Sequence, residues 1–291
     1  MTWITGGNFL TSVIYCSAPL IFWAMAVVFA ERVGIWFLGV EGIALAGALA
    51  GILGEIYLGA PIYGLFCAIG VGALLGWLMN LLLIRFPTDQ TAIGIAFNTT
   101  MLGLTSFIYR LGGSTSAAMV EGLSGSIGGF SIYGILALII VLGSWWYMFK
   151  TGAGLKLRSV GDGVAAAAAA GINVIRTRIL VMILAGVLAA LGGDALTQGW
   201  VKGYAENVTA GRGFIGMAAV YFGRWNPLLA TLACLVFGIG MALAYRFQAS
   251  SFSGSSSYLF SMIPYVLTLL AVAILGQAKS PADAGKPYLR K

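Results

Sequence analysis

The sequence is dominated by apolar segments that are long enough to cross a lipid bilayer as helices. Such a crossing takes about 20 apolar residues, because backbone polar groups in hydrocarbon must find their partners within the segment. Of the 291 residues, 60% are hydrophobic and only 9% are charged, whereas a soluble domain carries about 25% charged residues. We therefore expect an all-α fold, a polytopic membrane helical bundle, in which residues 1–291 form a single domain.

About nine membrane segments are expected, and one of them is short. The short segment, residues 214–223, cannot span the membrane alone, so we expect residues 208–223 to form a broken or re-entrant helix packed against protein. Broken helices of this kind often border a substrate path. No basic residue precedes the first segment, which favours a retained helix over a cleaved signal. The eight longer segments are residues 9–30, 35–53, 58–84, 91–109, 130–149, 179–196, 227–245 and 258–276.

The basic residues indicate an orientation, because Lys and Arg accumulate in cytoplasmic loops. The loop of residues 150–178 holds five of the 16 basic residues and a single acidic residue, Asp162, which places it in the cytoplasm. If the short segment completes a crossing, twelve basic residues lie inside and four outside; otherwise the count is eight against eight. We therefore expect nine crossings, with the N-terminus outside and the C-terminus in the cytoplasm.

Several functions are disfavoured by what the sequence lacks. There is no GxxxxGK[ST] loop to bind ATP, so active transport would need energy from a partner. The chain has no histidine, and Cys16, Cys67 and Cys234 lie far apart, which argues against a metal site. Its net charge of +7 is spread over short loops, unlike a nucleic-acid surface. We expect no catalytic residue, no metal and no cofactor in this chain.

A few polar side chains are predicted to lie within the membrane. Glu41 would lie roughly 13 Å beyond Arg32 along a continuous helix, and a carboxylate or amide at such depth either contacts the solute or bonds to a neighbouring helix. Both interpretations stay open. Arg212 is expected to cap an adjacent loop, and Asp194 to be solvated near the outer end of its segment. The candidate pathway residues are Glu41, Asn98, Thr99, Phe97 and Phe214, although packing is the commoner role for the phenylalanines.

A short helix is expected within the cytoplasmic loop. Asp162 is a suitable N-cap, the six alanines after Val164 have the highest helix propensity, and Gly171 can end the helix in the left-handed conformation. Such a helix, about 12 Å long, is either a surface connector or a docking element for another protein. The residues in question are Gly161, Asp162, Gly163, Ala166, Ala167, Ala168, Ala169 and Gly171.

Five stretches of the sequence, in order, resemble permease subunits of type II ABC importers. The resemblance is to the group paired with basic-membrane-protein-type lipoproteins, and it covers most of the chain. It departs where Val40 replaces a leucine, and where Asp162 and Gly163 stand in place of a common Glu-Asn-Pro. The stretches are ERVG at 31–34 with LGVEG at 38–42, FN at 97–98 with GLTSF at 103–107, GLKLRSVG at 154–161 with GIN at 171–173, ENVTAGRGFI at 206–215 with FGRWNP at 222–227, and PYVLTLL at 264–270 with PADAGKPY at 281–288.

The resemblance implies a permease subunit of the bacterial inner membrane that moves a nucleoside or related simple-sugar compound. It implies that the loop helix docks on a separate ABC ATP-binding subunit, which holds ATP and Mg. It also implies a second permease, either a homologous chain or a second copy, and an extracellular or periplasmic substrate-binding protein. The alternatives are a branched-chain amino-acid permease, which the 281–288 and 206–214 stretches disfavour, and an ion-coupled secondary transporter, for which Glu41 alone makes a poor relay.

Overall fold

The structure is a bundle of apolar helices. It is a computed structural model that describes residues 9–85, 89–116, 119–123, 126–127, 130–249, 262, 266 and 280–286. Seven helices in these ranges are long and apolar enough to cross a membrane, which confirms the predicted all-α membrane class. The described strands, β1 (Ser126–Ile127) and β2 (Phe130–Ser131), form one small antiparallel hairpin in which Ser126 pairs with Ser131.

The helices match seven of the eight long predicted segments, and the eighth, residues 258–276, lies outside the described residues apart from 262 and 266. The short predicted segment is also helical. In chain order the helices are α2 (Phe9–Arg32), α3 (Val40–Leu58), α4 (Pro61–Arg85), α5 (Gln90–Ser116), α6 (Ile132–Lys150), α7 (Gly152–Asp162), α8 (Val164–Ala169), α9 (Val174–Asp194), the π-helix η1 (Ala195–Val201), α10 (Arg212–Phe222) and α11 (Pro227–Ala249).

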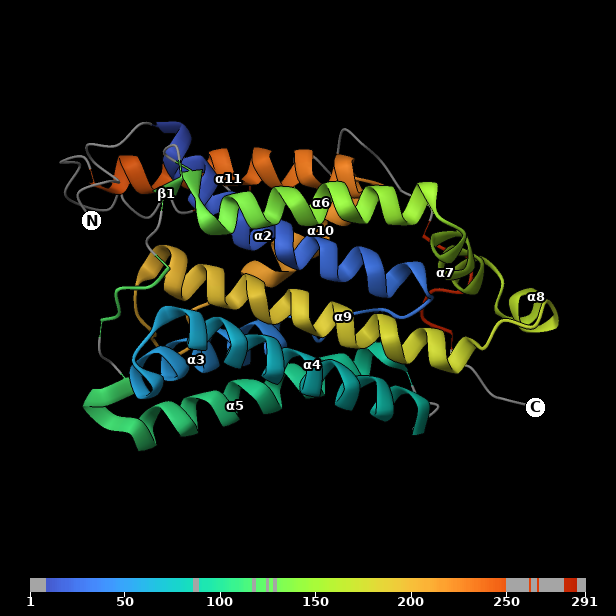
Figure 1. Ribbon diagram of the computed structural model, residues 1–291, viewed down its shortest axis with the longest axis horizontal. Coiled ribbons are helices and arrows are strands. Elements are labelled where there is room, and N and C mark those ends of the chain that lie inside the picture. Colours follow the sequence, from blue (N-terminus) through green and yellow to red (C-terminus); the bar gives the residue numbers. More distant parts are fainter. Residues whose placement is uncertain are drawn as a thin grey trace.

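The core of the bundle is built around α2. Figure 1 shows α2 and α9 in the middle, with α6 and α11 along one side and α3, α4 and α5 along the other. In the apolar stretch of α2, 89% of the residues are buried, whereas in that of α5 only 22% of the residues are buried. A helix that is apolar all round is expected inside a bundle, so α2 is the internal helix, whereas α5, like α4 and α6 at 28%, leaves a wide face uncovered.

Local sequence explains several helix ends. Proline is favoured in the first turn of a helix, because the N–H groups of that turn have no partner within the helix and proline loses no hydrogen bond there. Both α4 and α11 begin at a proline. The α3 helix ends at Gly59, whose φ of 80° is left-handed and whose N–H donates to the carbonyl of Glu55. These signals place the α3–α4 turn at residues 59–60, about five residues beyond the predicted end of the segment 35–53.

Helix α3 begins later than the sequence predicted. Residues 33–39 are not helical, and the helix starts at Val40 instead of residue 35. The depth predicted for Glu41 assumed a helix that continued from Arg32, and that assumption was wrong. The chain instead enters the bundle as an irregular segment, and α3 starts inside it.

The short predicted segment is a broken crossing. Helix α9 continues into η1, so Val201 lies at the opposite end of the bundle from Val174. The chain then returns through irregular residues 202–211 and the eleven-residue helix α10 to Trp225. The carbonyl of Trp225 accepts hydrogen bonds from the guanidinium of Arg32 at the end of α2, 3.1 and 3.0 Å long. The return path is therefore helical for only part of its length, as predicted.

Glycines hold α4 against α9. A Cβ added to Gly76 would lie 2.3 Å from the carbonyl oxygen of Met182, and one added to Gly72 would lie 2.6 Å from that of Gly186. Helix backbones can approach this closely only where side chains are absent. In the same way, Gly47 of α3 packs against the backbone of Ala190.

We predict that Gly76→Ala destabilises the protein, whereas Gly70→Ala on the same helix does not. The new methyl group at residue 76 would overlap backbone atoms of α9, which typically costs about 1–3 kcal/mol. A Cβ at Gly70 meets nothing within 4 Å. Thermal unfolding of the two variants in detergent tests this difference, and equal melting temperatures would contradict the packing described above.

Candidate functional site at a broken-helix junction

Two helices begin inside the bundle, and they begin next to each other. Helix α3 starts at Val40 and α10 at Arg212. Asn98, eight residues into α5 and therefore about 12 Å along it, donates to the carbonyl of Leu38 (2.7 Å) and accepts from the N–H of Gly42 (2.8 Å). The start of α3 is thus held well inside the bundle. We call the two starts and their capping side chains the junction.

Glu41 caps the start of α10. Its carboxylate accepts hydrogen bonds from the hydroxyl of Thr209, from the N–H of Gly211 (2.8 Å) and from the N–H of Gly213 (2.8 Å). The first N–H groups of a helix lack partners within it and carry the positive end of its dipole, so a carboxylate satisfies both requirements. A Cβ at Gly213 would lie 2.5 Å from Glu41 Oε2. Glycine at that position therefore lets the carboxylate reach the backbone.

The five predicted pathway residues do not form one cluster. Glu41 and Phe97 are buried, and Asn98 is committed to the start of α3. Thr99 is exposed on α5 and Phe214 is 41% exposed on α10. Glu41 and Asn98 therefore bond to neighbouring helices, one of the two interpretations left open by the sequence, and contact with a solute stays a prediction for all five.

The uncovered face of α5 carries small and hydroxyl-bearing residues. Thr99, Thr100 and Gly103 are exposed there, together with Phe107, which is 60% exposed. The two threonine hydroxyls donate to the carbonyls of residues 95 and 96 in the preceding turn. Small and hydroxyl residues on a membrane helix favour a neighbouring helix or a water-filled path over lipid.

The irregular segment 202–211 packs beside this part of α5. Arg110 near the end of α5 forms two hydrogen bonds with the carboxylate of Glu206 (2.9 and 3.0 Å), and these lower the pKa of Glu206. The rings of Tyr109 and Tyr204 lie 5.2 Å apart. The loop is thereby attached to α5 between the bundle end and the junction.

The backbone of segment 202–211 is strained. Lys202, Asn207 and Ala210 have φ values of 57°, 56° and 45°, in the left-handed region that residues other than glycine rarely adopt. Such strain persists only where surrounding contacts determine it, and it is frequent in functional segments. Here the fixed points are Arg110 at one end and the Glu41 carboxylate at the other.

Arg212 caps the loop, as predicted. Its guanidinium donates to the carbonyl of Val208 (2.9 Å) and to the hydroxyl of Tyr245 on α11 (2.9 Å). It also lies 5.8 Å from the ring centre of Trp200, which packs edge-on against Tyr245. The start of α10 is therefore fixed from both α3 and α11.

The far end of α10 is fixed by the ERVG stretch. Glu31 is buried and accepts hydrogen bonds from the indole N–H of Trp225 and from the hydroxyl of Tyr221 (3.3 Å). Arg32 donates to the carbonyl of Trp225. The two motif residues thus hold the α10–α11 turn, whose residues 224 and 225 have φ of 49° and 57°.

The prediction for Asp194 was wrong, because this residue is fully buried instead of solvated. Its carboxylate accepts a hydrogen bond from the hydroxyl of Tyr133 (2.7 Å), and Gln198 donates to the carbonyl of Gly51 (3.0 Å). Glu55 is also buried and accepts from the N–H of Gly122 (2.9 Å). Sequence reasoning missed this cluster, since its members come from separate elements. In the described part of the chain, no three His, Cys, Asp or Glu residues are grouped to hold a metal ion.

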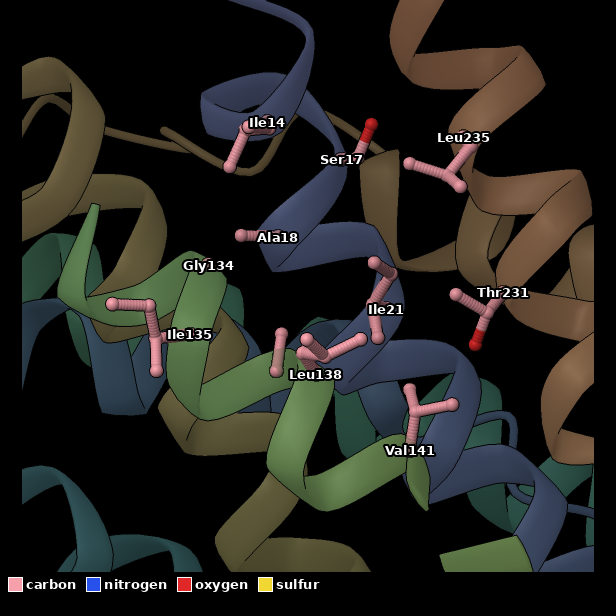
Figure 2. Close-up of a pocket in the computed structure, with 11 residues that line it drawn as sticks. Ile14, Ser17, Ala18, Ile21, Gly134, Ile135, Leu138, Val141, Thr231 and Leu235 are labelled. Carbon is pink, nitrogen blue, oxygen red and sulfur yellow. The ribbon is translucent and has the colours of Figure 1, made fainter. Parts of the chain in front are cut away.

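An apolar groove of about 310 Å³ lies between α2, α6 and α11, as Figure 2 shows. Its hydroxyl groups belong to Ser17 and Thr231, and both donate to carbonyls of their own helices. The remaining lining is aliphatic. Within the described part of the chain, the groove lining has no aromatic ring, whereas the α5 face carries two hydroxyl groups beside the exposed ring of Phe107, so we place the candidate site at the junction and the α5 face.

The loop of residues 150–178 contains two helices, α7 and α8, where one was predicted. Asp162 ends α7 and does not cap the alanine helix; that part of the prediction was wrong. The cap comes from far along the chain, because the N–H of Val164 donates to Asp283 Oδ2 (2.8 Å). Gly171 has a φ of 80°, the expected left-handed conformation. Ala166, Ala168 and Ala169 are exposed, whereas Ala167 is buried.

A multi-pass bundle with a broken helix in its interior and a helical loop at one end is the architecture of a membrane permease. The chain matches over residues 9–272 the family described as branched-chain amino acid transport system / permease component, and it belongs to that family.

Named relatives agree with this assignment. The guanosine ABC transporter permease protein NupQ of Bacillus subtilis is 34% identical over 94% of this chain and 94% of its own length. The nucleoside ABC transporter permease protein NupC of Lactococcus lactis is 32% identical over 97% of this chain and 96% of its own length. The solved structure of PsaBC from Streptococcus pneumoniae in complex with Fab is similar in fold, with a TM-score of 0.57 at 17% identity, covering 95% of this chain and 93% of that one.

We predict that Glu41→Ala loosens the start of α10. The change leaves the N–H groups of Gly211 and Gly213 without their acceptor, and each unsatisfied buried donor costs about 1–3 kcal/mol. Hydrogen exchange at these two amides should accelerate. Glu41→Gln, which keeps one acceptor oxygen, should give an intermediate rate, and Glu121→Ala on the exposed surface should change nothing. Unchanged protection of both amides in Glu41→Ala would rule out the capping role.

Proposed function

We propose that this chain is one permease subunit of an ABC importer that carries nucleosides or closely related sugar compounds into the cell. The observation that carries the proposal is the similarity to NupQ and NupC, which extends over nearly the whole chain at 34% and 32% identity. The membrane is the bacterial inner membrane, and the end of the bundle that bears α7 and α8 faces the cytoplasm, in keeping with its basic residues.

In this proposal the solute moves along the uncovered face of α5. Thr99 and Thr100 provide hydroxyl oxygens that can still accept hydrogen bonds, since only their protons are donated within α5. Phe107 provides an aromatic ring, and a nucleoside has both hydroxyl donors and a flat base to match these groups. A second permease subunit, either a homologous chain or a second copy, would close the path from the other side. An extracellular binding protein would deliver the solute.

The junction gives this path an element that can move. Segment 202–211 joins the outer end of the bundle to the start of α10, and its strained residues are kept in place by Arg110 and Glu41. A change between outward-open and inward-open states requires an element with two arrangements. We assign that role to segment 202–211 and α10, moving against α5.

The energy for transport would come from a separate ATP-binding subunit. The sequence contains no ATP-binding GxxxxGK[ST] loop, and α8 presents small, exposed side chains at one end of the bundle. Small side chains allow a helix to enter a groove on another protein closely. ATP and Mg would then be bound by the partner, and this chain would transmit the resulting movement.

We predict that the complex reconstituted in liposomes, with its ATPase, second permease and binding protein, takes up guanosine only when ATP is present. Labelled guanosine uptake is compared with that of leucine and of ribose in the same preparation. Preferred uptake of leucine would instead support an amino-acid permease. Guanosine uptake by this chain on an ion gradient, without the ATPase, would refute the proposal.

We also predict that Ala168→Glu with Ala169→Glu reduces binding of the ATPase subunit at least tenfold. Both side chains are exposed on α8, so the bulky charges should block docking without disturbing the bundle. Ala205→Glu, an exposed alanine on segment 202–211, is the matched control and should bind the ATPase normally. Binding is measured by copurification, and equal recovery of the ATPase with both variants would argue that α8 is only a connector.

A further inference from the structure

The described tail, residues 280–286, contacts three separate parts of the molecule. Asp283 accepts a hydrogen bond from the N–H of Val164 (2.8 Å) and donates its own N–H to the carbonyl of Gly161 (3.0 Å). The N–H of Gly285 donates to the carbonyl of Gly34 (3.2 Å), and the carbonyl of Lys286 accepts from the side-chain amide of Gln90 (3.3 Å). One short stretch therefore joins the α7–α8 pair, the irregular segment 33–39 and the first residue of α5.

The α7–α8 pair depends on the tail for its local structure. No residue of the loop caps α8 with its side chain, and the residue that precedes the helix is Gly163. The carboxylate of Asp283 takes the place of that missing cap. The exposed ion pair between Asp283 and Lys286 (2.9 Å) contributes little by itself, so the cap and the backbone bonds are the main contacts.

The same tail residues reach the segment that leads to the junction. Gly285 lies against the indole of Trp36, where an added Cβ would be 3.2 Å from the ring, and its φ of 79° requires glycine. The N–H of Trp36 donates to Gln90 Oε1 (2.9 Å). Two residues beyond Trp36, the carbonyl of Leu38 is held by Asn98. A continuous set of contacts thus runs from α8 through the tail to the start of α3.

Helix α7 also packs directly on the bundle, against α6 and against the end of α2, so the tail is an additional connection. Gly161 packs on the end of α2, where an added Cβ would be 2.2 Å from the carbonyl oxygen of Arg32. The carbonyl of Gly161 accepts its hydrogen bond from the N–H of Asp283. The packing of Gly161 on α2 opposes separation as well as compression, and the hydrogen bonds of the tail add a directional connection that continues to segment 33–39 and to Gln90.

We propose that the tail is the strut that transmits movement of α7 and α8 to the starts of α3 and α5, with Asp283 as its positioning residue. This inference rests on the proposed function, since it assigns the path by which work from the ATPase reaches the junction. Movement of α8 in either direction carries Asp283 with it. Through Gly285 and Gln90 that movement acts on segment 33–39 and on α5, whose uncovered face is the proposed solute path.

The test compares three variants in the full reconstituted complex. Asp283→Ala removes the acceptor for the N–H of Val164, Asp283→Asn keeps an acceptor oxygen, and Lys286→Met removes only the exposed ion pair. The measured quantity is the number of guanosine molecules imported per ATP hydrolysed. We expect Asp283→Ala to lower this ratio about fivefold, because losing an N-cap hydrogen bond shifts the equilibrium between the capped and the uncapped start of α8 by about that factor. Asp283→Asn and Lys286→Met should keep a ratio near the wild-type value.

Hydrogen exchange supplies a readout that does not depend on transport. In Asp283→Ala, exchange should accelerate at Val164 and in segment 33–39, while the α4 and α9 amides stay protected. Equal losses of uptake and ATP hydrolysis, with an unchanged ratio, would overturn the strut and leave Asp283 a stability residue. If wild-type protein imports no guanosine with ATP, the proposed function fails, and unaltered exchange in segment 33–39 of Asp283→Ala would separately refute the strut.

Discussion

The carboxylate of Glu41 bonded to the start of α10 is the interaction on which the interior of this protein depends. A helix that begins inside a membrane bundle leaves several N–H groups without partners, and hydrocarbon supplies none. Glu41 satisfies two of these groups and fixes the hydroxyl of Thr209. Without such a cap the N–H groups of Gly211 and Gly213 would lose the acceptor that they have in this structure. The acid residue, although costly to bury, makes a break in the helix possible.

The break is surrounded by fixed points. Asn98 holds the start of α3, Arg212 ties α10 to α11, and Glu31 holds the turn after α10. Glycine-mediated packing of α4 on α9 forms a rigid frame beside them. Outside these contacts lie the strained, non-helical backbone of segment 202–211, which Arg110 and Glu41 hold at its ends, and the uncovered face of α5. These are the elements to which we assign transport.

Much of the architecture could be predicted from the sequence, because length and hydropathy alone determine which segments can span a membrane. The break before α10 was also foreseeable, since ten apolar residues cannot cross alone. The start of α3 was not: residues 35–39 are as apolar as the helix that follows, and only the distant Asn98 shows where the helix begins. The existence of α5, like that of the other long helices, could be predicted from hydropathy. Which of its faces is uncovered depends on tertiary contacts that no local sequence pattern encodes.

The errors in the candidate site have the same origin. Asp162 satisfies every local rule for a cap, yet Asp283, 119 residues beyond Val164, occupies the position. Asp194 lies near the end of its segment and was expected to meet solvent, but the π-helix η1 extends the helix and encloses it among Tyr133 and Gln198. Long-range partners decide both cases. The buried aspartate also shows that polar residues near a membrane boundary cannot be assigned to water by position alone.

The intrahelical bonds of Thr99 and Thr100 have a consequence for how the assembly forms. Because both hydroxyls already donate to backbone carbonyls of α5, the uncovered face presents no unsatisfied hydroxyl donor at these positions to surrounding acyl chains. In the proposed assembly, this part of α5 would therefore tolerate lipid before the subunit meets its counterpart. The two permease subunits of the proposed assembly would then not have to be inserted at the same time. Each could fold in the membrane first, and pairing could follow by diffusion in the plane of the bilayer.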